Sequence, residues 1–185
     1  MLRKALILGG TGFLGRHVTT TLRAAGWVVY PAGSADCDLR QEKQVRTFLD
    51  RQCRTWAPEA VVHLAYPGSR YGIATSVQTP CTLAADLIQM DLHVIQALID
   101  RPAPTPRLLG MGSVCSYPEH TALPTDESQF WAGYPEPVNA AYGLAKRTQL
   151  MLLQAARQEH GLRGMHLILA NMYGPGDRSG HVIRR

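Results

Sequence analysis

A glycine-rich turn close to the first residue constrains the fold more than any other feature of the sequence. Residues 5–8 form an apolar run of strand length, and Gly9, Gly12 and Gly15 follow it at intervals of three. Between a strand and a helix, this spacing is typical of a dinucleotide-binding turn, in which the glycines allow a tight bend and a close approach to a pyrophosphate. The residues expected to contact the dinucleotide are Gly9, Thr11, Gly12, Phe13, Leu14 and Gly15. A glycine turn with a purely structural role is the alternative.

Downstream of this turn, apolar runs of strand length alternate with longer segments of helical character. We predict strands over residues 5–8, 27–30, 60–64, 108–111 and 166–170, and helices over residues 13–25, 41–54, 83–100 and 141–160. Residues 31–34 should break the second strand, residues 67–80 should form a loop, and residues 118–137 should be irregular. The alternation predicts an α/β fold with a doubly wound parallel sheet, a Rossmann domain over residues 1–170.

Tyr142 and Lys146 lie four residues apart in a predicted helix, so they share one helical face. A tyrosine titrates near ~10, and a nearby ammonium group lowers that pKa, which makes the phenol usable as an acid or a base. Together with the glycine turn upstream, the pair predicts hydride chemistry on a nicotinamide cofactor, NADP or NAD. A tyrosine of the hydrophobic core is the alternative.

Composition and charge exclude several other classes of protein. The net charge of +5 is mild, and the basic residues do not cluster with aromatic residues as in nucleic-acid-binding proteins. The four cysteines, Cys37, Cys53, Cys81 and Cys115, have neither CxxC nor metal-ligand spacing. We therefore expect a reduced, cytoplasmic protein without a metal site. The apolar part of the N-terminus is too short for a signal peptide or a membrane span, so we expect no membrane association.

The residues after the second strand should meet the adenosine of the cofactor. An acidic residue at this point favours NAD and an arginine favours NADP, but residues 31–34 contain neither. Arg16 could reach a 2′-phosphate, although a position on the helix surface is the simpler interpretation. Asp38 could accept a hydrogen bond from the adenine amine, or it could cap the helix that follows.

Four further stretches carry a family resemblance. Residues 112–118 read GSVCSYP, residues 134–139 read YPEPVN, residues 171–177 read NMYGPGD and residues 181–183 read HVI. With the glycine turn and the Tyr/Lys pair, they resemble the extended short-chain dehydrogenase/reductases, the NAD-dependent epimerase/dehydratase family. The similarity is greatest to members that epimerise and reduce GDP-linked sugars. It implies a nucleotide-sugar substrate, NADP or NAD as cofactor, and a homodimer paired through the two long helices.

The resemblance implies a role for each matching residue. Tyr142 would donate a proton to a 4-keto oxygen during reduction. Lys146 would hold the nicotinamide ribose and lower the pKa of Tyr142, and Ser113 would bind the carbonyl group. Cys115 and His181 would be the base and the acid that epimerise the carbons flanking the ketone. Other residues expected at the cofactor are Asp38, Leu39, Leu64, Ala65 and Asn171, and those expected at the substrate are Ser113, Val114, Cys115, Asn171 and Arg185.

Epimerisation needs an acid and a base in addition to the reducing set. A ketone acidifies the neighbouring C–H, so a thiolate can remove that proton and an opposing acid can return one on the other face. Cys115 follows Ser113 by two residues, so on an extended segment both side chains would face the same side. An ordinary buried thiol is the alternative for Cys115. We expect a structural or surface position for the histidines other than His181, which are His17, His63, His93, His120, His160 and His166.

The sequence departs from the family pattern in its last part. Residues 171–185 would be the truncated start of a substrate-binding region, and the lobe that closes over the nucleotide sugar in the family would be missing. Where the family has an asparagine, the match in the helix over residues 83–100 is Leu87, with Asp86 beside it. Two classes of function stay open: a nucleotide-sugar epimerase/reductase or another epimerase of the family, and a non-catalytic dinucleotide-binding subunit.

Overall fold

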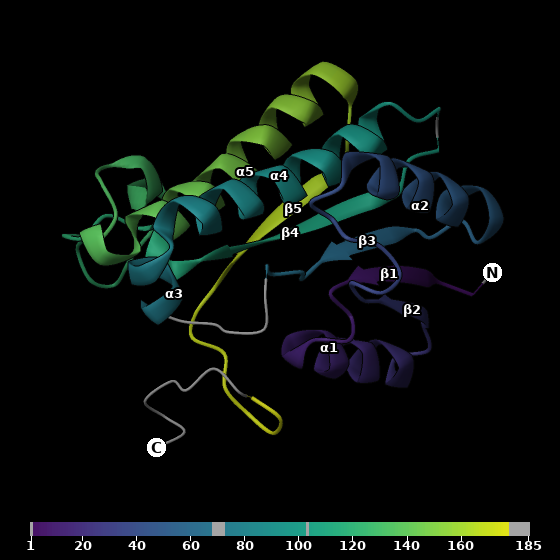
Figure 1. The fold of residues 1–185 in the computed structure, drawn as a ribbon, viewed down its shortest axis with the longest axis horizontal. Helices are drawn as coiled ribbons and strands as arrows, with labels where there is room; N and C mark the ends of the chain where they lie inside the picture. Colours follow the sequence, from purple (N-terminus) through teal and green to yellow (C-terminus); the bar gives the residue numbers. More distant parts are fainter. Residues whose placement is uncertain (1, 68–72, 103, 178–185) are drawn as a thin grey trace.

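A five-stranded parallel sheet with the order β2-β1-β3-β4-β5 forms the centre of the protein (Figure 1). The computed structural model describes residues 2–67, 73–102 and 104–177. The strands are β1 (Lys4–Leu8), β2 (Val28–Ala32), β3 (Ala60–His63), β4 (Arg107–Ser113) and β5 (Gly164–Leu169). Parallel strands need crossover connections, and the helices between them provide these. The predicted α/β fold with a doubly wound parallel sheet is confirmed.

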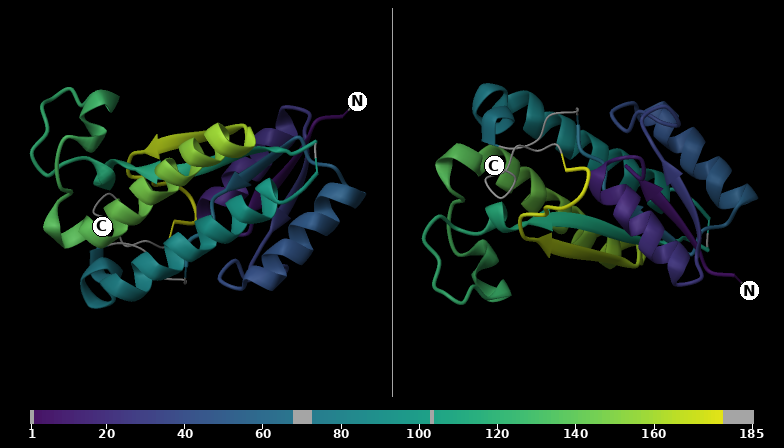
Figure 2. Two further views of the ribbon diagram at one scale, coloured as in Figure 1. Left: turned by 90° about the horizontal axis from the view of Figure 1, so that it is seen from above. Right: turned by 90° about the horizontal axis from the view of Figure 1, so that it is seen from below.

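Helices cover the two faces of the sheet unequally. The helices are α1 (Phe13–Ala24), α2 (Glu42–Thr55), α3 (Ile73–Gln78), α4 (Pro80–Ile99) and α5 (Ala140–His160). Three helices, α2, α4 and α5, lie on one face, and α1 lies on the other (Figures 1 and 2). Short 3-10 turns η1 (Val114–Ser116), η2 (Glu127–Trp131) and η3 (Pro137–Asn139) interrupt the chain between β4 and α5. This arrangement leaves the carboxyl ends of all five strands along one edge.

Alternation along each strand sends its side chains into different clusters on the two faces of the sheet. Leu6 and Leu8 of β1 pack with the side chains of α2 and α4, whereas Ile7 between them packs in the cluster that includes Val18 of α1. Successive residues of a strand point to opposite faces of the sheet. A strand that lies between two layers of helices therefore needs apolar side chains on both of its faces. The unbroken apolar runs in the sequence have this cause.

The predicted break of the second strand at residues 31–34 is wrong for Pro31 and Ala32, since the strand ends after Ala32. Strand β2 continues through Pro31 to Ala32, and Pro31 pairs in register with Ile7. Proline lacks an N–H group, so it is tolerated only where no neighbouring strand needs that donor. Strand β2 is an edge strand, which satisfies this condition.

The loop predicted over residues 67–80 also differs from the structure. It contains the short helix α3, and α4 starts at Pro80, three residues before the predicted start. Pro80 occupies the first turn of α4, where a missing N–H group costs nothing because no partner exists there. Helix α3 packs against the turn η3 and against α4.

Helix α4 is the one helix in the described part of the chain that is long and apolar enough to cross a membrane. It has 20 residues and a mean hydropathy of 1.2. It packs against α5 and α2 over the sheet, and Leu87, Val94 and Leu98 on it are almost completely buried. This position gives its apolar composition a role in the core.

The irregular segment between β4 and α5 is attached to α5 by a buried arginine. Arg147 Nε donates a hydrogen bond to the carbonyl oxygen of Ser116 (2.7 Å), and Nη1 donates to that of Gly133 (2.8 Å). The guanidinium also lies 5.5 Å from the ring centroid of Phe130. Arg147 therefore fixes the 3-10 turn η1 relative to the helix that carries Tyr142 and Lys146.

Candidate active site

A cavity of about 670 Å³ lies along the carboxyl ends of the strands. Open parallel sheets bind ligands at this edge, because the loops that follow the strands meet there. The predicted site residues that line the cavity are Gly9, Thr11, Gly12, Phe13, Leu14, Gly15, Asp38, Leu39, Leu64, Ala65, Ser113, Cys115, Tyr142, Lys146 and Asn171. The fold thus brings together residues that are up to 162 positions apart in the sequence.

The glycine turn has the geometry of an anion cradle. Gly9 has a φ of +82°, a conformation that residues with a Cβ rarely adopt. A Cβ on Gly15 would lie 2.1 Å from the carbonyl oxygen of Gly9, so only glycine lets α1 approach the turn this closely. Helix α1 starts after Gly12, and no side chain of the described residues caps it. Its first N–H groups remain available for a phosphate.

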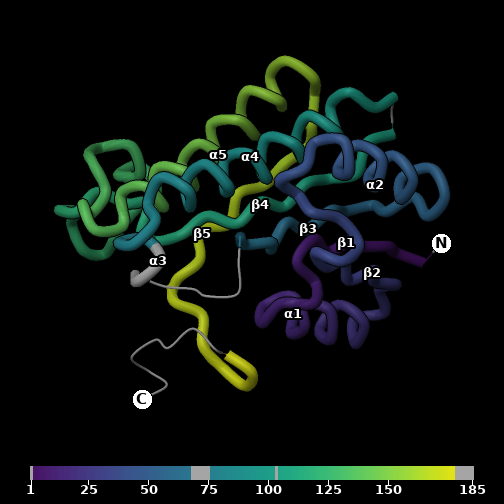
Figure 3. The backbone as a smooth tube through the Cα atoms, viewed as in Figure 1, coloured from purple at the N-terminus to yellow at the C-terminus, as the bar shows by residue number. Residues whose placement is uncertain are grey.

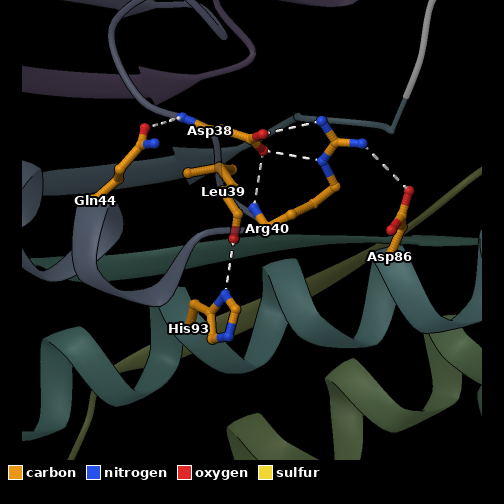
Figure 4. A network of polar contacts seen from close by, with 6 residues as sticks. All are labelled: Asp38, Leu39, Arg40, Gln44, Asp86 and His93. Atoms are coloured by element: carbon orange, nitrogen blue, oxygen red, sulfur yellow. Dashed lines mark hydrogen bonds and ion pairs between the residues drawn. The ribbon is translucent and has the colours of Figure 1, made fainter.

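Polar contacts from two helices hold the loop that carries Asp38 and Leu39 (Figure 4). The backbone N–H of Asp38 donates to Gln44 Oε1 on α2 (3.1 Å), and His93 Nδ1 on α4 lies 2.9 Å from the carbonyl oxygen of Leu39. Helix α2 begins after Gln41, which rules out Asp38 as its N-cap. Contacts with α2 and α4 therefore hold this loop in position without a ligand.

Arg40 was not among the predicted residues, although it lines the cavity beside Asp38. Its guanidinium donates to both carboxylate oxygens of Asp38 at 3.0 and 2.9 Å and lies 3.8 Å from Asp86 of α4 (Figure 4). The contact with Arg40 lowers the pKa of Asp38. Arg16, the other candidate cation, donates to the carbonyl oxygen of Thr11 (3.1 Å). The spacing of two residues between Asp38 and Arg40 is a sequence signal from which this ion pair could have been predicted.

Ser113 ends β4, and the chain then enters the turn η1 instead of staying extended. The side chain of Ser113 accepts a hydrogen bond from the backbone N–H of Cys115 (3.2 Å), which caps η1. The expectation of an extended segment is therefore wrong, because a serine at a strand end competes for the backbone as a cap. Ser113 and Cys115 nevertheless both line the cavity, whereas Val114 is 42% exposed and does not.

The pKa of Tyr142 differs from the expectation. Burial raises it, the contact with the Ser113 hydroxyl lowers it in part, and the charges of Cys115 and Asp91 raise it further. The net direction is upward, so the lowering expected from Lys146 is not found. Lys146 is itself only 6% exposed, and burial lowers its pKa, which weakens its positive charge as a partner for the phenol.

Several polar residues at the cavity escaped the sequence analysis. Glu136 and Asn139 line it, and Asn139 Nδ2 donates to Glu136 Oε2 (3.1 Å). His63 lines it at the end of β3 and is almost completely buried. The contact between Glu136 and Asn139 is local to the turn η3, whereas the place of His63 at the cavity depends on how β3 packs in the sheet.

The segment after β5 crosses from β5 to α1 and borders the cavity with Asn171. Its other end is attached to α1, since His17 Nε2 lies 2.9 Å from the carbonyl oxygen of Pro175. His181 and Arg185, predicted as a catalytic and a substrate-binding residue, lie outside the described residues. The predicted boundary between residues 1–170 and 171–185 stays a prediction.

Known proteins resemble the chain in sequence and in fold. The GDP-L-fucose synthase of Azorhizobium caulinodans is 31% identical over 98% of this chain and 57% of its own length. The structure of a GDP-L-fucose synthetase from Naegleria fowleri bound to NADP aligns with a TM-score of 0.78 at 23% identity, over 98% of this chain and 55% of that chain. A GDP-mannoheptose C4 reductase from Campylobacter jejuni with NADP bound aligns with a TM-score of 0.84 at 22% identity, over 96% and 54%.

The chain spans little more than half the length of these proteins. The sequence pattern of the NAD dependent epimerase/dehydratase family matches residues 5–185, nearly the whole chain. Its glycine turn, its sheet order and its Tyr/Lys pair at the cavity agree with that match. The protein is therefore a member of the NAD-dependent epimerase/dehydratase family.

Proposed function

We propose that the protein is a nucleotide-sugar epimerase/reductase that uses a nicotinamide cofactor. One observation carries the proposal: Ser113, Cys115, Tyr142 and Lys146 line the same cavity as the glycine turn. Ser113, Tyr142 and Lys146 suit carbonyl reduction, and the independent thiol of Cys115 suits proton abstraction beside the carbonyl. A cavity that only bound a dinucleotide would not need this set.

The glycine turn and the carboxyl edge of the sheet fit a dinucleotide. Gly9, Gly12 and Gly15 would hold the pyrophosphate, and Lys146 would hold the nicotinamide ribose. Loop residues Asp38 and Leu39 would contact adenine, with Arg40 keeping the carboxylate of Asp38 ionised. The cofactor supplies a hydride when it is bound. The other predicted cofactor contacts are Thr11, Phe13, Leu14, Leu64, Ala65 and Asn171.

The residues of the chain would supply the proton and the orientation for reduction. Ser113 would donate a hydrogen bond to the carbonyl oxygen of the sugar, and Tyr142 would transfer its phenolic proton to that oxygen as the carbon accepts hydride. A raised pKa suits a tyrosine that must stay protonated until this step. Lys146, four residues on, would stabilise the phenolate that remains.

Epimerisation would use the thiol of Cys115. As the thiolate, Cys115 would take a proton from the carbon next to the ketone and become a thiol, with the electron pair moving onto the oxygen bound by Ser113 and Tyr142. An acid on the opposite face would return a proton, and His181 is the candidate. Asn171 and Arg185 are the further candidates for contacts with the substrate, whereas Val114 does not line the cavity.

The substrate that we propose carries GDP. The similar proteins named above are a GDP-L-fucose synthase, a GDP-L-fucose synthetase and a GDP-mannoheptose C4 reductase. NADP is our first choice of cofactor, because both solved structures contain it. NAD stays the second choice, because residues 31–34 at the end of β2 contain no arginine, and Arg40 at the cavity and Arg16 on α1 contact a carboxylate and a carbonyl oxygen, respectively.

The test is a titration of the 185-residue chain with NADPH and, separately, with NADH, followed by nicotinamide fluorescence. GDP-4-keto-6-deoxymannose is then added, and oxidation of the cofactor is measured. Binding followed by oxidation is the expected result. Failure of both cofactors to bind would contradict the proposal at its first step. Binding without oxidation would favour the second class, a dinucleotide-binding unit that does not reduce this sugar.

We also propose a homodimer formed through α4 and α5. The two helices lie side by side over the sheet (Figure 1), and Met151 on α5 is 46% exposed. Sedimentation should give a mass of two chains, and Met151→Glu should give one. The cytoplasm is the compartment we propose, because all four cysteines are free thiols, which suits a reducing environment.

A further inference from the structure

A polar layer is buried between the sheet and the helices α4 and α5, where a Rossmann core is normally apolar. Its base is a row of three residues in register across β3, β4 and β5: His63 pairs with Gly110, and Gly110 pairs with His166. Residues in register on parallel strands point to the same face. Both histidines therefore face the helices that carry Asp91 and Lys146.

Asp91 on α4 is the acidic member of this layer. It is 3% exposed, its Oδ1 lies 3.1 Å from His63 Nε2, and the same oxygen accepts a hydrogen bond from Gln149 Nε2 of α5. Its Oδ2 has no hydrogen-bond partner among the described residues. Burial raises the pKa of Asp91, but His63 and the charge of Lys146 outweigh this, so its pKa is lowered and it is ionised.

The two glycines of β4 make room for the layer. A Cβ on Gly110 would lie 2.4 Å from Gln149 Oε1, and one on Gly112 would lie 2.2 Å from His166 Nε2. Side chains at these positions would displace the groups that surround Asp91. The strand that ends at Ser113 is thus built to accommodate polar side chains directly beneath the cavity.

We propose that Asp91 is a positioning residue for the Tyr142/Lys146 pair: its buried carboxylate, held by His63 and Gln149, keeps Lys146 charged beside the cavity. The catalytic consequence rests on the proposed function, but the charge coupling does not. An ammonium group loses its hydration when it is buried, and a nearby opposite charge offsets part of that cost. Gln149, whose side chain donates to Asp91, lies one helical turn after Lys146 on α5, so both side chains are on the face of α5 that meets α4. Burial lowers the pKa of Lys146, and the charge of Asp91 raises it.

The titratable groups around Lys146 come from four elements. They are Asp91 on α4, His63 on β3, His166 on β5 and Tyr142 on α5. Burial and the charge of Lys146 lower the pKa of His166, so this histidine stays neutral and does not compete with Asp91. The positive charge of Lys146 therefore has one negative counterpart in the layer.

The coupling can be measured directly, because the chain contains three lysines, Lys4, Lys43 and Lys146. The amines are methylated with a ¹³C label, the three NMR signals are assigned with Lys4→Arg and Lys43→Arg, and each is titrated with pH. Asp91→Asn should move the pKa of Lys146 down by about one unit or more. Asp100→Asn, at the exposed end of the same helix, should leave it in place. An unchanged Lys146 titration in Asp91→Asn would overturn the proposal.

A reciprocal variant covers the case in which Asp91→Asn does not fold. Lys146→Met removes the cation, so the pKa of Asp91 should rise, and carboxyl ¹³C signals report this. No rise in that pKa would also overturn the proposal.

Turnover gives the catalytic readout. In Asp91→Asn, kcat for sugar reduction should fall at the alkaline end of the pH profile, with KM for the sugar within about twofold of the original. A pH profile of unaltered shape would show a merely structural role. If the original chain never oxidises the cofactor, the proposed function fails while the lysine titration still decides the coupling.

Discussion

The hydroxyl of Ser113 accepts a hydrogen bond from the backbone N–H of Cys115 at 3.2 Å, and it also contacts Tyr142 and lowers its pKa. One side chain thus caps the turn that carries the proposed base and tunes the proposed acid. The position of the Cys115 thiol and the pKa of Tyr142 therefore both depend on Ser113.

Ser113→Ala should affect both proposed steps. Removing the cap should cost about 1 kcal/mol of unfolding free energy, as at helix N-caps. Losing the contact should raise the pKa of Tyr142 further, and kcat should fall by about tenfold or more because a hydrogen bond to the developing oxyanion is lost. Ser116→Ala is the matched control, since its hydroxyl is buried and has no partner among the described residues. Equal kcat values in the two variants would contradict the role of Ser113.

Tyr142→Phe should separate cofactor binding from reduction. The phenyl ring can keep its contact with Tyr66, whose ring centroid lies 6.2 Å away, so the fold and the affinity for NADPH should change little. Loss of a general acid should reduce kcat by about 10²-fold or more. Fluorescence titration and the rate of cofactor oxidation measure the two quantities. Undiminished oxidation would exclude Tyr142 as the proton donor.

Cys115→Ala should separate epimerisation from reduction. Without the thiol, exchange of the protons beside the ketone with deuterated solvent should slow by about 10²-fold, because the proposed base is removed. Reduction of a keto sugar that already has the product configuration should persist. Cys81→Ala, a cysteine in the first turn of α4 that does not line the cavity, is the control. Full deuterium exchange in Cys115→Ala would assign the base elsewhere.

Sequence patterns predicted the fold correctly where the local spacing of residues is enough to determine the local structure. The spacing of Gly9, Gly12 and Gly15 has few structural solutions, and the structure has the strand, turn and helix that it predicts. Pro31 misled the prediction because its effect depends on strand order. Only the position of β2 at the edge makes a proline acceptable there, and edge position is a property of the whole sheet.

The polar layer could not be predicted from the sequence for a related reason. Asp91 lies in an apolar helix, and nothing near it in sequence suggests a partner. Its partners His63 and Gln149 come from a strand and a helix that meet it only through tertiary packing. The histidines were expected to be structural or on the surface, which gave no indication that His63 would contact a buried carboxylate beside Lys146.

Replacing two glycines of the turn by alanine should have different effects, one on stability and the other on cofactor affinity. A Cβ on Gly15 would lie 2.1 Å from the Gly9 carbonyl oxygen, so Gly15→Ala should cost about 2 kcal/mol or more of unfolding free energy. A Cβ on Gly12 would have one close neighbour in the described structure, at 3.2 Å, and would otherwise point into space for a ligand. Gly12→Ala should stay folded and lose at least about tenfold in NADPH affinity, ~1.4 kcal/mol. Urea unfolding and fluorescence titration distinguish the two, and similar stability losses in both would contradict this division.

His166 should make the stability of the protein depend on pH. Burial and the charge of Lys146 lower its pKa to about 4, whereas an unfolded histidine titrates near 6.5. Between these two values the unfolded chain binds a proton that the native chain does not. The unfolding free energy should therefore decrease as the pH falls from 6.5 towards 4, and it is unaffected by this residue above 6.5. Because His166 is partly exposed, we expect a decrease of about 2 kcal/mol, less than the full shift implies.

Urea unfolding at pH 7.5 and at pH 5 measures this dependence. His166→Leu should remove most of the difference between the two values, because a leucine binds no proton in either state. His120→Leu, whose side chain is 95% exposed in the original protein, should keep it. The lowered pKa of Asp91 lies below this window, so its own titration does not enter the comparison. A pH dependence that survives in His166→Leu would mean that another buried group takes up the proton.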